Sequence, residues 1–92
     1  MTLAMARHIL LKTKEEAEKV KLRLANGEAF DVLAKKFSTC PSAKKGGDLG
    51  EVKKGQMVGS IDKVIFKQPL NKTHGPIKSK FGYHLVMVYF RD

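Results

Sequence analysis

The segment from Tyr83 to Arg91 constrains the fold more than any other part of the chain, because neither of its sides is polar. Side chains along an extended strand point alternately to opposite faces of a sheet. One side of this segment carries His84, Val86, Val88 and Phe90, and the other carries Tyr83, Leu85, Met87 and Tyr89. A strand that is apolar on both sides needs cover on both, so we predict a central strand of a sheet.

A second strand and a helix are predicted near the start of the chain. Ala6 to Leu11 is short and rich in aliphatic residues, which is typical of a buried strand. Thr13 and Glu16 form a capping box, in which a hydroxyl and a carboxylate each satisfy a backbone N–H at a helix start. Apolar residues recur at helical spacing as far as Asn26-Gly27, where glycine tolerates the left-handed conformation that ends a helix.

The middle of the chain predicts shorter elements. Phe30, Leu33, Ala34 and Phe37 have the i, i+3, i+4 and i+7 spacing of a short helix with one apolar side. Residues 38–50 are rich in Ser, Pro, Lys and Gly, which indicates an ordered loop. We expect strands at about 49–52 and 75–79, turns at 53–55 and 81–82, and a short helix that points Ile61, Val64 and Ile65 inward.

Strands at both ends of the chain, with helices between them, predict an α+β fold in which helices pack on a small, mostly antiparallel sheet. The length of 92 residues suits a single domain, which we place at residues 1–92 with a core over about residues 6–91. We expect this domain to be a monomer.

The charge balance is the most unusual part of the composition. Lys and Arg number 18 against 9 Asp and Glu, and the formal net charge of +9 nominates nucleic acid, anionic membrane or acidic polypeptides as partners. Nucleic-acid-binding surfaces interleave aromatic residues or arginines with their charge, whereas this chain has no tryptophan and most of its cations are lysines. We therefore interpret most of the charge as a solvated lysine surface.

The single cysteine and the short apolar segments bear on the compartment. Cys40 has no partner for an internal disulfide, so we predict a reduced thiol and a cytoplasmic protein. No apolar run approaches the roughly 20 residues of a membrane-spanning helix, and residues 1–6 lack the basic start and the length of a secretory signal. An extracytoplasmic location is expected instead if the domain was excised from a longer chain or a signal was removed.

Two histidines lie inside predicted strands. His8 belongs to the first strand and His84 to the last. A single histidine in such a place is most often a core imidazole bonded to a backbone carbonyl. If the terminal strands pair, however, the two rings become neighbours, and each can hold the tautomer of the other.

Cys40 is a candidate nucleophile, because a lone cysteine with histidines elsewhere in the chain is one pattern of Cys-His catalysis. The alternative is a small buried hydrophobe, the commonest role of a free cysteine. Pro41 has no N–H for an oxyanion hole, which disfavours covalent hydrolysis. His8, Cys40, His74 and His84 lack the spacing of metal ligands, and no cofactor motif is present, so we expect neither a metal nor a cofactor.

Three apolar residues stand beside turns or at a helix start: Met57, Ile61 and Phe81. Taken singly, each could be ordinary core. Together with the thiol and the imidazoles, they indicate an apolar pocket beside polar groups, without a carboxylate pair or a phosphate-binding loop.

Six short motifs resemble, in the same order, those of the parvulin family of peptidyl-prolyl cis/trans isomerases, and most closely its small single-domain bacterial type. They are His8-Ile9-Leu10, Cys40-Pro41-Ser42, Gly46-Gly47-Asp48-Leu49-Gly50, Gly55-Gln56-Met57, Gly75-Pro76-Ile77 and Phe81-Gly82-Tyr83-His84. The resemblance covers about residues 6–91, nearly the whole chain.

The resemblance implies a four-stranded antiparallel sheet surrounded by about three to four helices, with an active site on one face of the sheet. It assigns catalytic roles to His8 and His84 as paired imidazoles and to Cys40 as the polar group beside the substrate carbonyl. The implied proline pocket has Met57 and Phe81 as walls and Leu49, Gln56 and Ser79 at its edge. Ile61, where the family usually has Phe, and Gly59, where Pro is common, are expected to touch that pocket and to alter it.

The function that follows is peptidyl-prolyl cis/trans isomerisation of proline-containing polypeptides, by a non-covalent mechanism. Some family members select phosphorylated Ser/Thr-Pro with a basic cluster between the first strand and the first helix. That connection here is only Lys12-Thr13-Lys14, so we expect no dependence on phosphate. The alternatives are a peptide-binding, chaperone-like module with little turnover, and a basic module that binds nucleic acid or anionic membrane.

Overall fold

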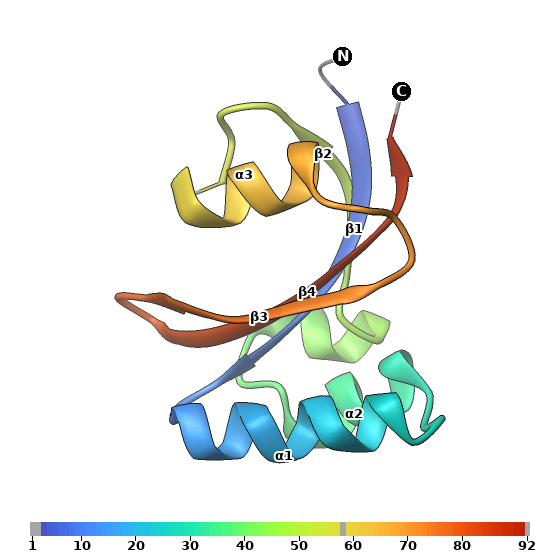
Figure 1. The fold of residues 1–92 in the computed structure, drawn as a ribbon, viewed down its shortest axis with the longest axis vertical. Coiled ribbons are helices and arrows are strands. Elements are labelled where there is room, and N and C mark those ends of the chain that lie inside the picture. The colour runs from blue at the N-terminus through green and yellow to red at the C-terminus, as the bar shows by residue number, and fades with distance from the viewer. Residues whose placement is uncertain (1–2, 58, 92) are drawn as a thin grey trace.

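One antiparallel sheet of four strands organises the molecule, in the order β2-β1-β4-β3 (Figure 1). The strands are β1 (Leu3–Leu11), β2 (Asp48–Lys53), β3 (Thr73–Ser79) and β4 (Gly82–Arg91). The helices are α1 (Lys14–Ala25), α2 (Phe30–Phe37), the 3-10 helix η1 (Pro41–Lys45) and α3 (Gly59–Lys67). The predicted α+β fold, with four strands and three to four helices, is confirmed.

The structure, a computed structural model, describes residues 3–57 and 59–91. Met1, Thr2, Val58 and Asp92, which the predicted domain of residues 1–92 includes, lie outside the described residues. None of the helices in the described part of the chain is long and apolar enough to cross a membrane.

Strand β4 is central, as its two apolar sides predict, because it pairs with β1 on one edge and β3 on the other. Leu85 points to the side of the sheet that α1 and α2 cover, whereas Val86 and Val88 point to the side of α3. Figure 1 shows these helices in separate layers above and below the sheet. Phe90 differs from the prediction, since it is 46% exposed, beside a shift in the β1–β4 register.

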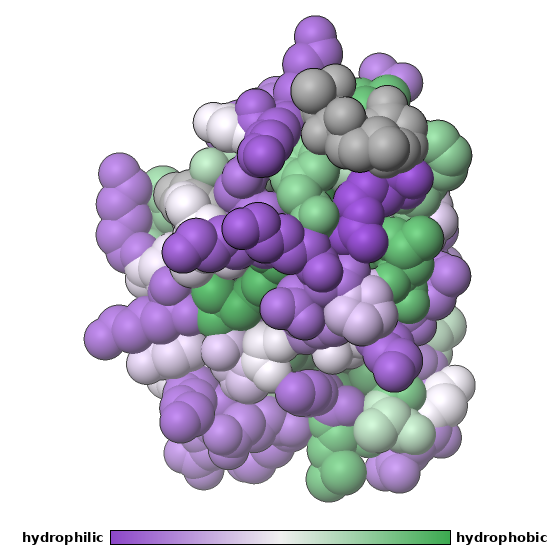
Figure 2. Space-filling view, turned by 45° about the horizontal axis from the view of Figure 1, so that its top comes forward, coloured by the Kyte–Doolittle hydropathy of each residue, from purple (hydrophilic) through white to green (hydrophobic). Residues whose placement is uncertain are grey.

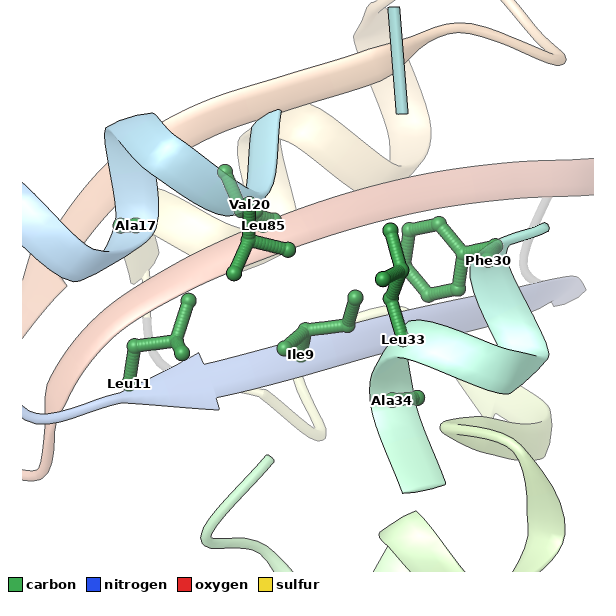
Figure 3. Packing of buried hydrophobic residues seen from close by; sticks show 8 residues of the cluster. All are labelled: Ile9, Leu11, Ala17, Val20, Phe30, Leu33, Ala34 and Leu85. Atoms are coloured by element: carbon green, nitrogen blue, oxygen red, sulfur yellow. The ribbon is translucent and has the colours of Figure 1, made fainter. Parts of the chain in front are cut away.

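The larger core lies between the sheet and the helix pair α1 and α2. Side chains from β1, β4 and both helices interlock there (Figure 3): Ile9, Leu11, Ala17, Val20, Phe30, Leu33, Ala34 and Leu85. Each large aliphatic side chain buried in this way stabilises the fold by about 1.5–3 kcal/mol. This layer holds β1 and β4 in place from below, and it leaves their other face for α3 and the candidate site.

The helix boundaries follow the predicted signals. The Thr13 hydroxyl accepts a hydrogen bond from the Glu16 N–H at 3.1 Å, which caps the start of α1. At its end, Gly27 has a φ of +99°, and the Glu28 N–H returns to the Arg23 carbonyl at 3.2 Å. Since β1 ends at Leu11 and α1 begins at Lys14, only two residues connect these elements.

The predicted loop at residues 38–50 is more regular than expected. Pro41 starts η1, because its fixed φ suits the first position of a helix. The Gly47 N–H bonds to the Ser42 carbonyl at 2.9 Å as the chain leaves η1, and β2 begins at once at Asp48. This turn sets Ser42 beside β1.

Hydrophilic side chains dominate the face seen in Figure 2, with apolar side chains in separate patches between them. This pattern agrees with the interpretation of the lysines as a solvated surface.

Candidate active site

The two buried histidines lie side by side on neighbouring strands. His8 in β1 pairs with Val86 in β4, and His84 pairs with Leu10, so the two side chains are diagonal neighbours. Their Nδ1 atoms are 3.3 Å apart, and their rings stack with centroids 5.5 Å apart and an interplanar angle of 16°. The prediction that the terminal strands pair and bring these histidines together is confirmed.

A serine holds the outer nitrogen of each ring. The Ser42 oxygen lies 3.1 Å from His8 Nε2, and the Ser79 oxygen lies 2.6 Å from His84 Nε2. Hydrogen bonds thus run from Ser42 through His8 and His84 to Ser79, which we call the serine–histidine chain. Two proton arrangements satisfy it, since donation can run in either direction while both imidazoles stay neutral.

Both histidines favour the neutral form. Burial, together with a smaller effect of the nearby His84, lowers the pKa of His8 to about 4. Burial also lowers the pKa of His84. Two imidazolium rings would place one Nδ1–H against another at 3.3 Å, so the pair accepts at most one proton.

A small apolar cavity adjoins the His84 end of this chain. Its volume is about 220 Å³, and it is lined by Gln56, Met57, Ile61, Phe81 and His84. Ile61 is buried at its floor, whereas Phe81 is 62% exposed and stands at its mouth. The Phe81 N–H donates to the Ser79 oxygen at 3.1 Å, which ties the mouth of the cavity to the serine–histidine chain.

The structure therefore brings together most of the predicted site: both histidines, Ser79 and four of the pocket residues. Leu49 does not line this cavity but lines a second one beside η1, although it packs against the same core cluster as Met57. Gly59 does not line the first cavity, and the space around its Cα is open, so its expected contact with the pocket is not found there.

Cys40 is half-buried at the start of η1. Its N–H bonds to the Ser38 oxygen at 3.3 Å. Within the described residues, the hydrogen bonds of the two histidine rings go to each other and to Ser42 and Ser79, and the thiol takes no part in them. The catalytic role of Cys40 stays a prediction.

Ser42 is the site residue that sequence reasoning missed. The available signal was Pro41, because a proline that starts a tight helical turn fixes the direction of the residue after it. Nothing in the sequence, however, indicates that this turn lies against His8.

Comparison with known families matches residues 8–89 to the rotamase family, described as the PPIC-type PPIase domain. The chain belongs to this peptidyl-prolyl isomerase family. The parvulin resemblance drawn from its motifs is thereby confirmed.

Similar proteins include foldases of bacteria. The foldase protein PrsA of Bacillus subtilis is 45% identical over 82 residues, which are 88% of this chain and 28% of that protein. PrsA of Clostridium tetani is 43% identical over 88 residues, or 95% of this chain and 26% of that protein. The chain thus spans little more than a quarter of these relatives.

Solved structures show the same PPIase fold. The crystal structure of Bacillus subtilis PrsA has a TM-score of 0.90 and 42% identity, over 95% of this chain and 34% of that one. The parvulin NmPin of Nitrosopumilus maritimus has a TM-score of 0.86 and 38% identity, over 97% of both chains. A Campylobacter jejuni structure from work on PEB4 and the periplasmic protein Cj1289, described as SurA-like chaperones, has a TM-score of 0.88 and 29% identity. The match covers 96% of this chain and 38% of that one.

Proposed function

We propose that this domain catalyses the cis/trans isomerisation of X–Pro bonds in polypeptides by a non-covalent mechanism that needs no phosphate. The observation that carries the proposal is the apolar cavity whose wall includes His84. His84 is hydrogen-bonded to His8, and both imidazoles favour the neutral form. Membership of the PPIC-type family and similarity to PrsA foldases support it.

Peptidyl-prolyl isomerisation requires no nucleophile among the side chains. Rotation about a peptide bond faces a barrier of roughly 18–20 kcal/mol because it breaks amide resonance, yet no bond is made or cut. An enzyme need only favour the twisted state. In our proposal, Met57, Ile61 and Phe81 hold the pyrrolidine ring away from water, which strengthens polar interactions with the carbonyl as it twists. Because donation in the serine–histidine chain can reverse, the histidines can follow the changing charge on the amide.

The proposal is tested with a peptide isomerisation assay on a Leu-Pro substrate. We expect the domain to accelerate the reaction, and Phe81→Ala to lower kcat/KM about tenfold, because the exposed ring at the cavity mouth is lost. Phe90→Ala removes another half-exposed ring outside the cavity and should change kcat/KM less than twofold. Binding of the peptide without acceleration would contradict the isomerase proposal and support the peptide-binding alternative.

We expect no preference for phosphopeptides. The connection between β1 and α1 consists of Lys12 and Thr13, which is too short for a clustered phosphate clamp. PhosphoSer-Pro and Glu-Pro peptides should therefore be isomerised at rates within a few-fold of each other. A tenfold advantage of the phosphopeptide in the same assay would show this expectation to be wrong.

Cys40→Ser should keep measurable isomerase activity, at no less than about a tenth of the wild-type kcat/KM. The reason is that the thiol is outside the serine–histidine chain and a non-covalent route needs no nucleophile. Circular dichroism should show the variant folded. Loss of all activity in a folded Cys40→Ser protein would favour a covalent route.

The proposed partners are proline-containing polypeptides, and the monomeric state stays a prediction. The cytoplasm is our prediction from Cys40. The similarity to a structure from work on a periplasmic chaperone supports the extracytoplasmic alternative.

A further inference from the structure

A second cavity adjoins the other end of the serine–histidine chain. Its volume is about 340 Å³, and it lies between η1 and the start of β2, lined by Pro41, Ser42, Lys44, Lys45, Asp48 and Leu49. The isomerisation mechanism proposed above makes no use of it.

Ser42 links this cavity to the active site. Its side chain lines the cavity and lies 3.1 Å from His8 Nε2, while His84, at the other end of the pair, lines the proline cavity. The two cavities therefore stand at the two ends of one hydrogen-bonded chain. An extended peptide advances about 3.3 Å per residue, so a substrate with proline in the first cavity reaches the second within a few residues.

The second cavity carries net positive charge, because two lysines and one aspartate line it. Lys44 and Lys45 are exposed, and the salt bridge found in the described part of the chain joins Arg23 and Glu28 instead. The one carboxylate at the cavity, Asp48, has an oxygen committed to the Gly50 N–H and the Tyr89 hydroxyl, each at 2.9 Å. Among the described residues, neither lysine forms a salt bridge with Asp48, so both ammonium groups are free to bind an anion at a cavity with a formal net charge of +1.

The apolar residues of this cavity favour an anion that also carries apolar groups. Leu49 and Pro41 offer apolar surface beside the two ammonium groups. A Glu side chain has methylene groups for that surface and a carboxylate for the lysines, so it satisfies both parts at once.

We propose that the cavity between η1 and β2 is a substrate subsite that binds an acidic side chain near the isomerised proline, an inference that rests on the proposed function. The domain would then favour acidic segments of its polypeptide substrates. The favoured carboxylate occupies one position, or two neighbouring positions, relative to proline, because the serine–histidine chain fixes the two cavities relative to each other.

The test is a scan of one proline peptide with Glu or Gln at each position from two residues before proline to three after it. At low salt, we expect kcat/KM to favour Glu over Gln about threefold to fivefold at one or two neighbouring positions, as for an exposed ion pair. The ratio should approach one in 0.5 M salt, since the lysines are exposed. A uniform preference at all positions would instead indicate general attraction by the net charge and overturn the subsite.

A matched pair of variants locates the effect. Lys44→Gln/Lys45→Gln should abolish the preference for Glu. Lys35→Gln/Lys36→Gln removes the same charge from the exposed side of α2 and should preserve it. Equal loss in both variants would contradict the subsite. If no peptide is isomerised at all, the proposed function is wrong, and dissociation constants of the same Glu and Gln peptides still decide whether the subsite exists.

Discussion

Gly47→Ala is expected to lower the free energy of unfolding by about 3–5 kcal/mol, through left-handed backbone strain and a clash. Gly47 has a φ of +82°, and a Cβ there would stand 2.4 Å from the His8 carbonyl oxygen and 3.0 Å from the Ala34 Cβ. The backbone cannot simply move away, because the His8 N–H donates to the Gly47 carbonyl at 2.9 Å. Small domains are stable by only about 5–15 kcal/mol, so this loss is a large share of the total.

Gly50→Ala is the matched control for this prediction. Gly50 also has a positive φ, +67°, but no atom lies within 4 Å of a Cβ built on it. It should cost only the left-handed strain, about 1–2 kcal/mol. Urea unfolding of both variants measures the difference, and equal losses would mean that the contact between Gly47 and His8 is not tight in solution.

A glycine also packs closely against the backbone of the second histidine. Gly75 has a φ of +122°, and a Cβ there would stand 2.4 Å from the His84 carbonyl oxygen. Each histidine of the pair thus lies on a stretch of strand that a glycine approaches closely. The close approach gives Gly47 and Gly75 a structural role beside the histidines, whereas a Cβ on Gly46 would meet Asp31 instead.

Local signals in the sequence were enough to predict most of the fold. The cap at Thr13 and the end at Gly27 act within one helix turn, so they are visible without knowledge of the rest of the chain. The central place of β4 follows equally from its own two apolar sides.

The site was predictable only in part, because it depends on contacts between distant segments. His8 and Ser42 are 34 positions apart, and their contact depends on how η1 packs beside β1. The same packing gives Leu49 a place in the second cavity and leaves the Cys40 thiol out of the serine–histidine chain. Periodicity and turn signals carry no information on such packing, whereas the family resemblance anticipated the histidine pair and most of its pocket.

Acidification from pH 7 to 4.5 is expected to reduce the free energy of unfolding by about 2–3 kcal/mol through the histidine pair. Burial lowers the pKa of folded His8 to about 4, against 6.5 for an exposed histidine. Between these values the unfolded chain binds more protons than the folded one, so stability falls as pH falls through this window. The lowered pKa of His84 acts in the same direction, and the pair shares at most one proton.

His8→Gln tests the source of this pH dependence. The variant should be less stable at pH 7, because it disturbs the serine–histidine chain, yet its loss of stability between pH 7 and 4.5 should shrink by more than half. His74→Gln removes a histidine outside the chain, one whose ring bonds to the Pro69 carbonyl, and it should keep the wild-type loss. Urea unfolding at several pH values gives the pH dependence of the free energy of unfolding for both variants. A wild-type slope in His8→Gln would mean that groups other than the buried pair cause the loss, and that the folded protein accommodates a protonated His8 without cost.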